Sequence, residues 1–159
     1  LGLLETPSTS SVESDLQAGG QSGHRAPEPQ TAPTGTLDET VGLTVTSSEG
    51  TVTLSPADAG RGDLVTDGNA LHYSADDYGV VLTGEGSAAN AGYVVINDPS
   101  APATYTFDMT VNDAPAALVE SDGFVLVEDP QTGKVVNTLG RPWATDADGS
   151  AVPTWYTSL

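Results

Sequence analysis

The feature that most constrains this chain is an alternation of apolar and polar residues that recurs in short runs after residue 40. Residues 41–46 read Val-Gly-Leu-Thr-Val-Thr and residues 51–54 read Thr-Val-Thr-Leu, with Glu49 and Gly50 between the two runs. A period of two places successive side chains on opposite faces of a strand. Two such runs joined by a turn that contains glycine predict a β-hairpin.

More short runs of this kind follow along the chain, and they are rich in Val, Thr and Tyr. They lie at 71–73, 78–82, 93–96, 104–111, 124–127 and 134–136. Asp-Gly and Asn-Asp dipeptides separate many of them, and these residues reach the positive φ angles of tight hairpins. No segment after residue 40 sustains the spacing of an amphipathic helix. The sequence therefore predicts an all-β fold, an antiparallel β-sandwich-like domain of eight or nine short strands.

The run at 104–111 is the clearest single strand. Its apolar set is Tyr105, Phe107, Met109 and Val111, and its polar set is Thr104, Thr106, Asp108 and Thr110. A slip of one residue would bury Asp108 and expose both aromatic rings, so the register should be tightly specified. We expect this strand to lie centrally in its sheet, with one dry face.

The first 40 residues differ in kind from the rest of the chain. They hold 6 of the Leu, Ile, Val and Phe residues, whereas residues 41–159 hold 27 and also all nine aromatic residues. A segment dominated by Ser, Thr, Pro and Gly buries too little apolar area to offset its chain entropy. The sequence predicts a disordered linker or stalk over 1–40 and a β-sandwich-like domain over 41–159.

The chain is strongly acidic, with 22 Asp and Glu against 4 Lys and Arg and a formal net charge of -18. Four cations cannot form the basic surface that nucleic acid or an anionic membrane requires, so both are excluded as partners. The absence of cysteine excludes disulfides and Cys-ligated zinc, and no apolar run is long enough to insert into a membrane. An acidic, cysteine-free domain on a Ser/Thr/Pro-rich stalk predicts export to the cell surface or the medium.

The C-terminal part carries a distinctive combination of three segments within residues 97–156. They read NDPSAPATYTFDMTV, SDGFVLVEDPQTGKVV and RPWATDADGSAVPTWY. This combination resembles a β-rich region of large secreted or surface proteins of high-GC Gram-positive bacteria, some of them RHS/YD-repeat or polymorphic-toxin-like. The matching residues are Asp98, Pro99, Pro102, Tyr105, Phe107, Asp122, Gly123, Gly133, Pro142, Trp143, Ala144, Asp146, Gly149, Val152, Pro153 and Tyr156.

This resemblance implies a β-rich module whose partners are other domains of the same polypeptide. It brings no catalytic residue and no cofactor. Members of the family continue with one further strand after the position that corresponds to Leu159. The domain is therefore expected to be truncated at its C-terminus.

Asp146 and Asp148 are the candidate metal-ligating residues. With Gly149 at position 6 of an EF-hand loop, these two carboxylates would stand at positions 3 and 5. Ala144 and Trp155 would then occupy the positions of two essential ligands, which excludes an EF-hand. A looser calcium site completed by Asp76-Asp77 or Glu128-Asp129 stays open. The favoured alternative is a plain hairpin turn with Gly149 in the left-handed conformation.

Trp143, Trp155 and Tyr156 are the candidate ligand-binding residues. The two tryptophans bracket the turn at Asp148-Gly149, so a hairpin would bring their rings toward one edge of the core. Exposed neighbouring rings would form a platform on which sugars stack. The favoured alternative is packing, with each ring against the core and its indole N–H bonded to a loop carbonyl.

Other motifs are better explained by the fold than by chemistry. Arg61-Gly62-Asp63 spells an integrin-binding tripeptide, but three residues match easily by chance. His72 lies in a predicted strand and His24 in the predicted linker. Gly84-Glu85-Gly86 lacks the lysine of a phosphate-binding loop. Among 22 carboxylates, any pair proposed for glycoside hydrolysis lacks specificity.

Taken together, these patterns predict a non-enzymatic structural or spacer module of a larger secreted or surface protein. The alternative is a binding module for carbohydrate or cell-wall polymer, with calcium as a further stabilising ligand.

Overall fold

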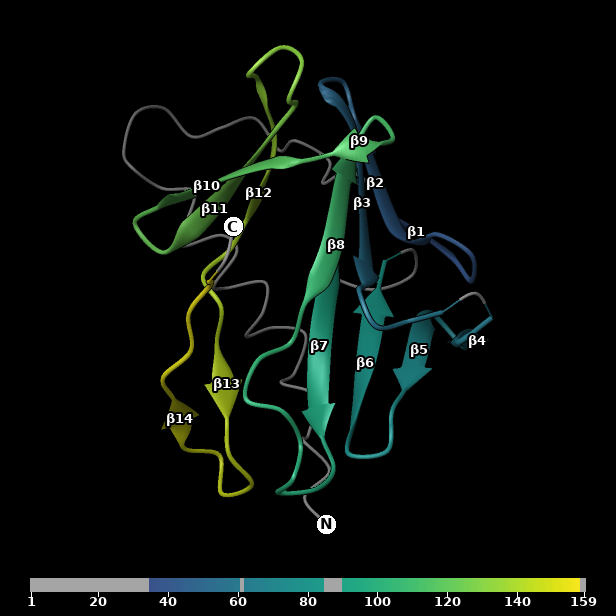
Figure 1. Cartoon of the computed structure of the whole chain (residues 1–159), viewed down its shortest axis with the longest axis vertical. Helices are drawn as coiled ribbons and strands as arrows, with labels where there is room; N and C mark the ends of the chain where they lie inside the picture. Colours follow the sequence, from purple (N-terminus) through teal and green to yellow (C-terminus); the bar gives the residue numbers. More distant parts are fainter. Residues whose placement is uncertain (1–34, 61, 85–89, 158–159) are drawn as a thin grey trace.

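The structure is a computed structural model that describes residues 35–60, 62–84 and 90–157. Within these residues the chain forms fourteen strands in four antiparallel sheets and no helix (Figure 1). The predicted all-β antiparallel fold is confirmed. Residues 1–34 of the linker predicted over 1–40 lie outside the described residues.

The largest sheet has five strands in the order β1-β2-β3-β8-β9. These strands are β1 (Gly35–Asp38), β2 (Gly42–Ser47), β3 (Gly50–Pro56), β8 (Phe107–Val111) and β9 (Ala114–Pro115). The hairpin predicted at Glu49-Gly50 joins β2 to β3, with Ser47 opposite Gly50. Strand β1 corrects the predicted boundary at residue 40. It forms because its backbone pairs with β2 while Leu37 packs against the core.

One face of this sheet is apolar and the other is rich in threonine. Directly opposed residues share a face, and two apolar rows result: Leu43, Leu54 and Met109, and then Val45, Val52 and Val111. The row Thr36, Thr44, Thr53 and Thr110 crosses four strands on the opposite face. The period of two in the sequence thus gives one face for burial and one for solvent.

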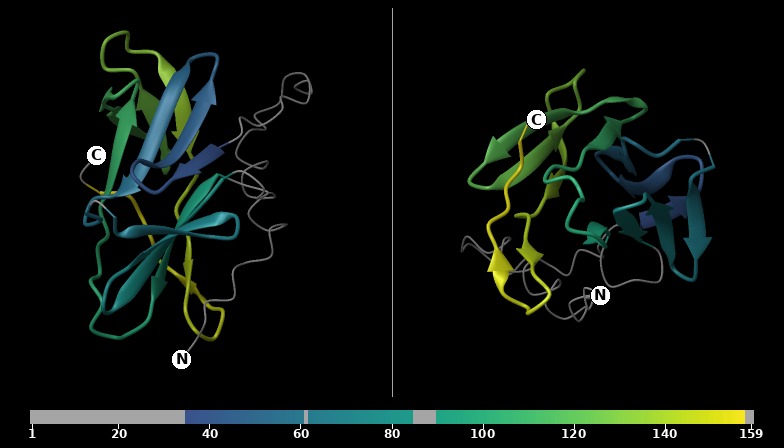
Figure 2. Two further views of the ribbon diagram at one scale, coloured as in Figure 1. Left: turned by 90° about the vertical axis from the view of Figure 1, so that its right-hand side faces the viewer. Right: turned by 60° about the horizontal axis from the view of Figure 1, so that its bottom comes forward.

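A four-stranded sheet covers one end of the apolar face (Figures 1 and 2). Its strands follow the chain order: β4 (Leu64–Asp67), β5 (Ala70–Ser74), β6 (Tyr78–Thr83) and β7 (Ala91–Ile96). The buried cluster between the two sheets comprises Leu43, Val45, Leu64, Leu71, Tyr78, Val80 and Leu82. Two sheets that pack through their apolar faces make this part sandwich-like.

A three-stranded sheet covers the other end of the same face. It consists of β10 (Ala117–Ser121), β11 (Phe124–Glu128) and β12 (Val135–Leu139), and a small hairpin of β13 (Ala144–Thr145) and β14 (Ala151–Val152) follows. The second buried cluster comprises Val52, Val111, Val127 and Val136. The five-stranded sheet therefore supports both smaller sheets.

The strand predicted over 104–111 is shorter than expected. Strand β8 begins at Phe107, and Thr104–Thr106 lie outside the ladder. Tyr105 nevertheless packs against the first cluster. The central strand is β3 rather than β8, because the outer neighbour of β8 is the two-residue strand β9.

No helix in the described part of the chain has the length and apolar character needed to cross a membrane.

Candidate functional site

A groove of about 350 Å³ lies where the last described residues pass the turn between β10 and β11. Its lining residues are Glu120, Asp122, Gly123, Arg141, Pro142, Thr154, Trp155 and Tyr156. Two of the three ligand-binding residues predicted from the sequence, Trp155 and Tyr156, thus meet charged residues that are distant in sequence. We define this set of residues as the Trp155 groove.

The turn between β10 and β11 fixes the acidic side of the groove. Asp122 and Gly123 have φ angles of 53° and 84°, and they connect Ser121 directly to its partner Phe124. Asp-Gly favours such a two-residue turn because both positions need positive φ. The Glu120 carboxylate accepts a hydrogen bond from the Gly123 N–H at 3.3 Å. Both carboxylates are therefore carried by a tightly specified hairpin.

Arg141 supplies the positive charge of the groove. Its guanidinium carbon lies 5.0 Å from the centroid of the Phe124 ring, within the range of a cation–π contact. Its side chain also passes close to Gly123, where an added Cβ would lie 3.5 Å from Nε. The aromatic ring and the turn together hold this side chain beside Glu120 and Asp122.

The aromatic side of the groove combines an anchored ring with an exposed one. The Tyr156 hydroxyl donates a hydrogen bond to the Gly140 carbonyl at 2.7 Å, and burial raises the pKa of this tyrosine. The neighbouring Trp155 is 71% exposed, the highest value among the exposed large hydrophobic residues. The packing role favoured from the sequence is therefore wrong for Trp155, because its ring faces solvent at the groove.

Trp143 lies elsewhere. Its ring meets Tyr93 of β7 edge to face, with centroids 6.3 Å apart and planes at 65°, and it is 40% exposed. The β13–β14 hairpin pairs Ala144 with Val152, yet the described structure contains no ring contact between Trp143 and Trp155. The shared platform that the sequence left open is therefore not formed.

Asp146 and Asp148 belong to the turn between β13 and β14. The Asp146 Oδ1 atom accepts hydrogen bonds from the N–H groups of Asp148 at 3.0 Å and Ser150 at 2.8 Å. Gly149 has a φ of 80°. This geometry is that of the plain hairpin turn, with Gly149 in the left-handed conformation, that the sequence favoured over a calcium site. Within residues 35–60, 62–84 and 90–157, no three His, Asp or Glu side chains are grouped to hold a metal ion.

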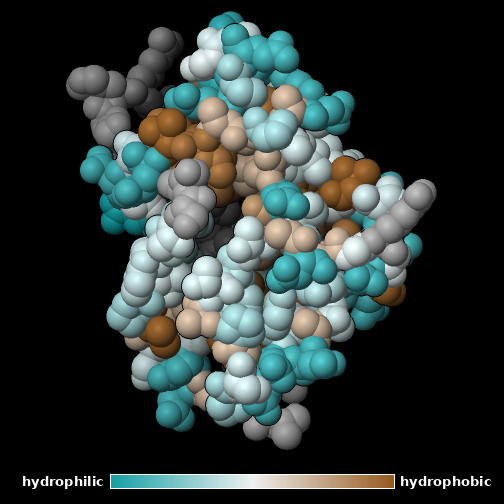
Figure 3. Space-filling model, in the orientation of Figure 1, coloured by the Kyte–Doolittle hydropathy of each residue, from teal (hydrophilic) through white to brown (hydrophobic). Residues whose placement is uncertain are grey.

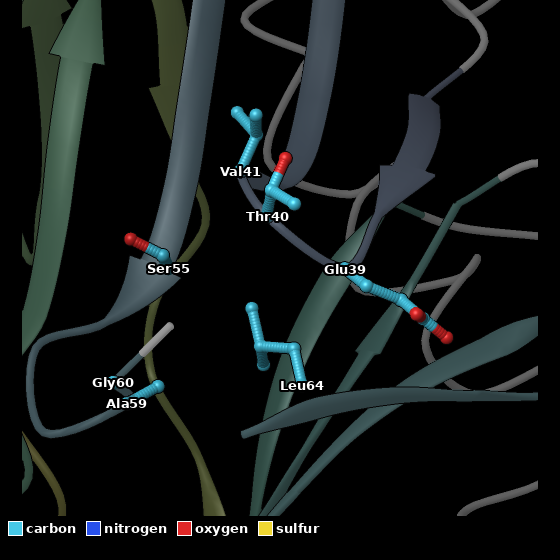
Figure 4. Close-up of a pocket in the computed structure, with 7 residues that line it drawn as sticks. All are labelled: Glu39, Thr40, Val41, Ser55, Ala59, Gly60 and Leu64. Atoms are coloured by element: carbon cyan, nitrogen blue, oxygen red, sulfur yellow. The ribbon is translucent and has the colours of Figure 1, made fainter. Parts of the chain in front are cut away.

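A second hollow of about 370 Å³ lies between the β1–β2 turn and β4. Figure 4 shows its lining residues: Glu39, Thr40, Val41, Ser55, Ala59, Gly60 and Leu64. The Glu39 side chain points away from the centre of the hollow, and its carboxylate accepts the Thr66 N–H at 2.8 Å. That hydrogen bond lowers the pKa of Glu39. With its one charged side chain already engaged and no aromatic ring, this hollow offers little for recognising a ligand.

The remaining sequence motifs contribute little to a site. His72 lies half-buried in β5, opposite Val65 and Val81. Arg61 of the Arg-Gly-Asp tripeptide, His24 and the Glu85-Gly86 pair lie outside the described residues.

Of the two hollows described above, the Trp155 groove has the more varied chemistry: an exposed indole, an anchored phenol, a guanidinium and two carboxylates. Reasoning from the sequence identified its aromatic residues but missed Arg141, Glu120 and Asp122. Only the Asp122-Gly123 turn signal pointed toward them. No family model, curated protein or solved structure matches this chain.

Proposed function

We propose that this chain is a non-enzymatic module of a larger secreted or surface protein, and that it binds a carbohydrate or cell-wall polymer in the Trp155 groove. The observation that carries this proposal is the 71% exposure of Trp155 beside an anchored Tyr156. A large indole left in solvent gains apolar contact when a ligand covers it.

The chemistry of the groove matches a sugar. The C–H face of a pyranose ring is apolar and stacks on an indole, while its edge carries hydroxyl groups. Arg141 offers N–H donors to those hydroxyls, and Glu120 and Asp122 offer acceptors. The volume of about 350 Å³ is near the lower end of the roughly 300–1,000 Å³ typical of small-ligand sites. Such a groove suits a short stretch of a polymer.

The setting of the proposal rests on the sequence. An acidic chain without cysteine and the resemblance of residues 97–156 to β-rich regions of secreted bacterial proteins support an extracellular module. Other domains of the same polypeptide would then be its covalent partners.

A purely structural spacer is the second candidate. It is favoured by the way the five-stranded sheet packs against two others through separate apolar clusters, with the three-stranded sheet beside it and the four-stranded sheet toward the opposite end of the long axis (Figure 1). A body built in this way would hold neighbouring domains apart without any ligand.

Substitution of the two tryptophans separates these candidates. We expect Trp155→Ala to weaken retention on insoluble cell-wall polysaccharide by about tenfold or more, since stacking supplies much of the affinity. Trp143→Ala, the matched control, should change retention by less than about twofold. The readout is the bound fraction across a polysaccharide titration, with thermal melting to show that both variants are folded.

If Trp155→Ala and the unchanged chain are retained equally on every polysaccharide tested, the groove is not a glycan site and the spacer role is favoured.

A further inference from the structure

Resting on the proposed function, we infer that the Trp155 groove selects glycans that carry free amino groups, such as polymers containing unacetylated glucosamine. The charges that line the groove determine this ligand class. Its starting point is the pair Glu120 and Asp122 beside an exposed indole.

The balance of charge within the groove is negative. Its described lining holds two carboxylates and one guanidinium. The Phe124 ring holds the guanidinium of Arg141, which keeps its single positive charge, and the Glu120 carboxylate accepts one hydrogen bond from a described residue, the neutral N–H of Gly123. Carboxylates bind most strongly to charged donors such as an ammonium group. The acidic side of the groove therefore has unused capacity for a cation.

The whole chain reinforces this local preference. Its net charge of -18 creates a negative potential that repels acidic polymers and attracts cationic ones. Uronic-acid polymers and phosphate-rich polymers are disfavoured on the same ground. Neutral glycans experience no such force.

The exposed indole of Trp155 adds a third contribution. A protonated amine held near the face of a tryptophan ring is attracted by the ring quadrupole. An acetylated amine is neutral and lacks that attraction, although its sugar ring still stacks. A protonated amine is thus attracted by the carboxylates, by the indole ring and by the net negative charge of the chain.

The experiment compares two ligands of equal length on the full chain: oligomers of glucosamine and oligomers of N-acetylglucosamine. Binding is measured by calorimetry at mildly acidic pH, where most of the sugar amines are protonated. We expect glucosamine oligomers to bind about tenfold more tightly, and this advantage to shrink as salt is added.

Two double variants with equal changes in charge locate the effect. In Glu120→Gln with Asp122→Asn, the advantage of the amine should fall to about twofold or less. Glutamine keeps an oxygen for the Gly123 N–H, and asparagine tolerates the positive φ of residue 122. In the control, Glu49→Gln with Asp67→Asn, both residues are exposed and lie outside the groove, Glu49 in the turn between β2 and β3 and Asp67 at the end of β4, so most of the advantage should remain.

Each outcome is decisive. Equal binding of both oligomers overturns the amine inference and leaves the glycan proposal standing. If neither oligomer binds, nor any other polysaccharide, both are overturned. An advantage that is unchanged in the groove variant, or equally reduced in the control, assigns the selectivity to the overall charge and overturns the role of Glu120 and Asp122.

Discussion

At the scale of single residues, aspartate side chains hold many of the turns. The Oδ1 atom accepts the N–H group two residues later, at 2.7 to 3.0 Å, in four places: Asp38, Asp98, Asp129 and Asp146. Hydrogen bonds from the hydroxyl and N–H groups of Thr40 and Ser100 lower the pKa values of Asp38 and Asp98. Local turn chemistry, which needs no ligand, therefore explains these four aspartates among the described residues.

Three tyrosines form the most distinctive polar feature of the first cluster. Tyr78 meets Tyr73 and Tyr105 edge to face, with centroids 6.2 and 4.9 Å apart. The Tyr78 hydroxyl donates to the Asp58 carboxylate at 3.1 Å. The Tyr105 hydroxyl is buried without a hydrogen-bond partner among the described residues. The three rings share one packing role but differ in how their polar ends are satisfied.

Tyr105→Phe should stabilise the protein. A buried hydroxyl without a partner costs on the order of 1 kcal/mol or more, and phenylalanine removes it while keeping the ring contacts. Tyr78→Phe is the matched control and should destabilise, because Asp58 loses its donor. Chemical denaturation of both variants tests the pair. A loss of stability in Tyr105→Phe would show that its hydroxyl has a partner in solution.

Alkaline pH should destabilise the fold through Tyr78. Burial, followed by the hydrogen bond and the charge of Asp58, raises the pKa of Tyr78 to about 12. The native state therefore keeps this proton more tightly than the unfolded chain, whose tyrosines titrate near 10. Its contribution is complete below about pH 10 and is lost as the pH rises toward 12.

The checks are an absorbance titration of tyrosinate and the free energy of unfolding measured across the same pH range. Tyr78→Phe should remove the latest-titrating phase and flatten the decline in stability. A wild-type titration with every tyrosine ionising near its ordinary pKa would contradict this account.

At the scale of elements, the alternation of apolar and polar residues located the strands that have several apolar residues on one face and polar residues on the other. Strands β6 and β11 alternate buried and more exposed residues throughout, and β2 does so from Leu43 to Thr46. Strand β3 buries Val52 and Pro56, with Leu54 half-buried between them. Strand β1 was missed because Leu37 is its one large apolar residue, and its pairing depends on β2. Strand β4 was missed because it buries Leu64 alone.

The opposite error occurred at Thr104–Thr106. These residues have the composition of a strand, and Tyr105 is packed inward as predicted. They lie outside any ladder: β3 ends at Pro56 opposite Phe107, and beyond that pair a single backbone hydrogen bond remains, from the Ala57 N–H to the Thr106 carbonyl at 3.0 Å. Alternation reports which side chains are buried, whereas strand pairing depends on a neighbour that the local sequence does not contain.

Asn112 joins three elements and offers a test of how the sheets are held together. It follows β8 with a φ of 50°, and its Oδ1 accepts the Thr51 N–H at 3.1 Å. Its Nδ2 reaches Asp129 Oδ2, in the turn after β11, at 3.5 Å. The side chain thus links the five-stranded and three-stranded sheets.

Asn112→Ala should lower the free energy of unfolding by about 1–3 kcal/mol, since it removes these bonds and places a Cβ-bearing residue without local hydrogen bonding at positive φ. Asn112→Gly removes the same bonds but tolerates the backbone angle, so it should cost less. Urea titrations of the two variants separate the contributions. Equal stability of all three proteins would argue against the link between the sheets.

At the scale of the whole molecule, the candidate site depends on the meeting of three separate segments. The sequence identified Trp155 and Tyr156 as candidate ligand-binding residues, with packing against the core as the alternative. Arg141 follows β12, and Glu120 and Asp122 belong to the β10–β11 hairpin, so only the fold brings them to the C-terminal residues. No local pattern encodes that proximity.

The outer surface has a mixed character, with apolar residues gathered over β10 and β11 in the view of Figure 3. Val119 on β10 is 43% exposed and lies opposite Leu126 of β11. This apolar area lies on the hairpin that carries Glu120 in β10 and Asp122 in its turn. The acidic rim of the groove therefore stands beside one of the less polar parts of the surface.

The central claim is that a glycan covers Trp155, and the indole N–H signals in a two-dimensional NMR spectrum test it most directly. The chain has two tryptophans, so the spectrum contains one indole signal from Trp155 and one from Trp143. Titration with glucosamine oligomers should shift the Trp155 signal in a saturable way and leave the Trp143 signal in place. A Trp155 signal that does not move with glucosamine oligomers or with any other glycan would contradict the account.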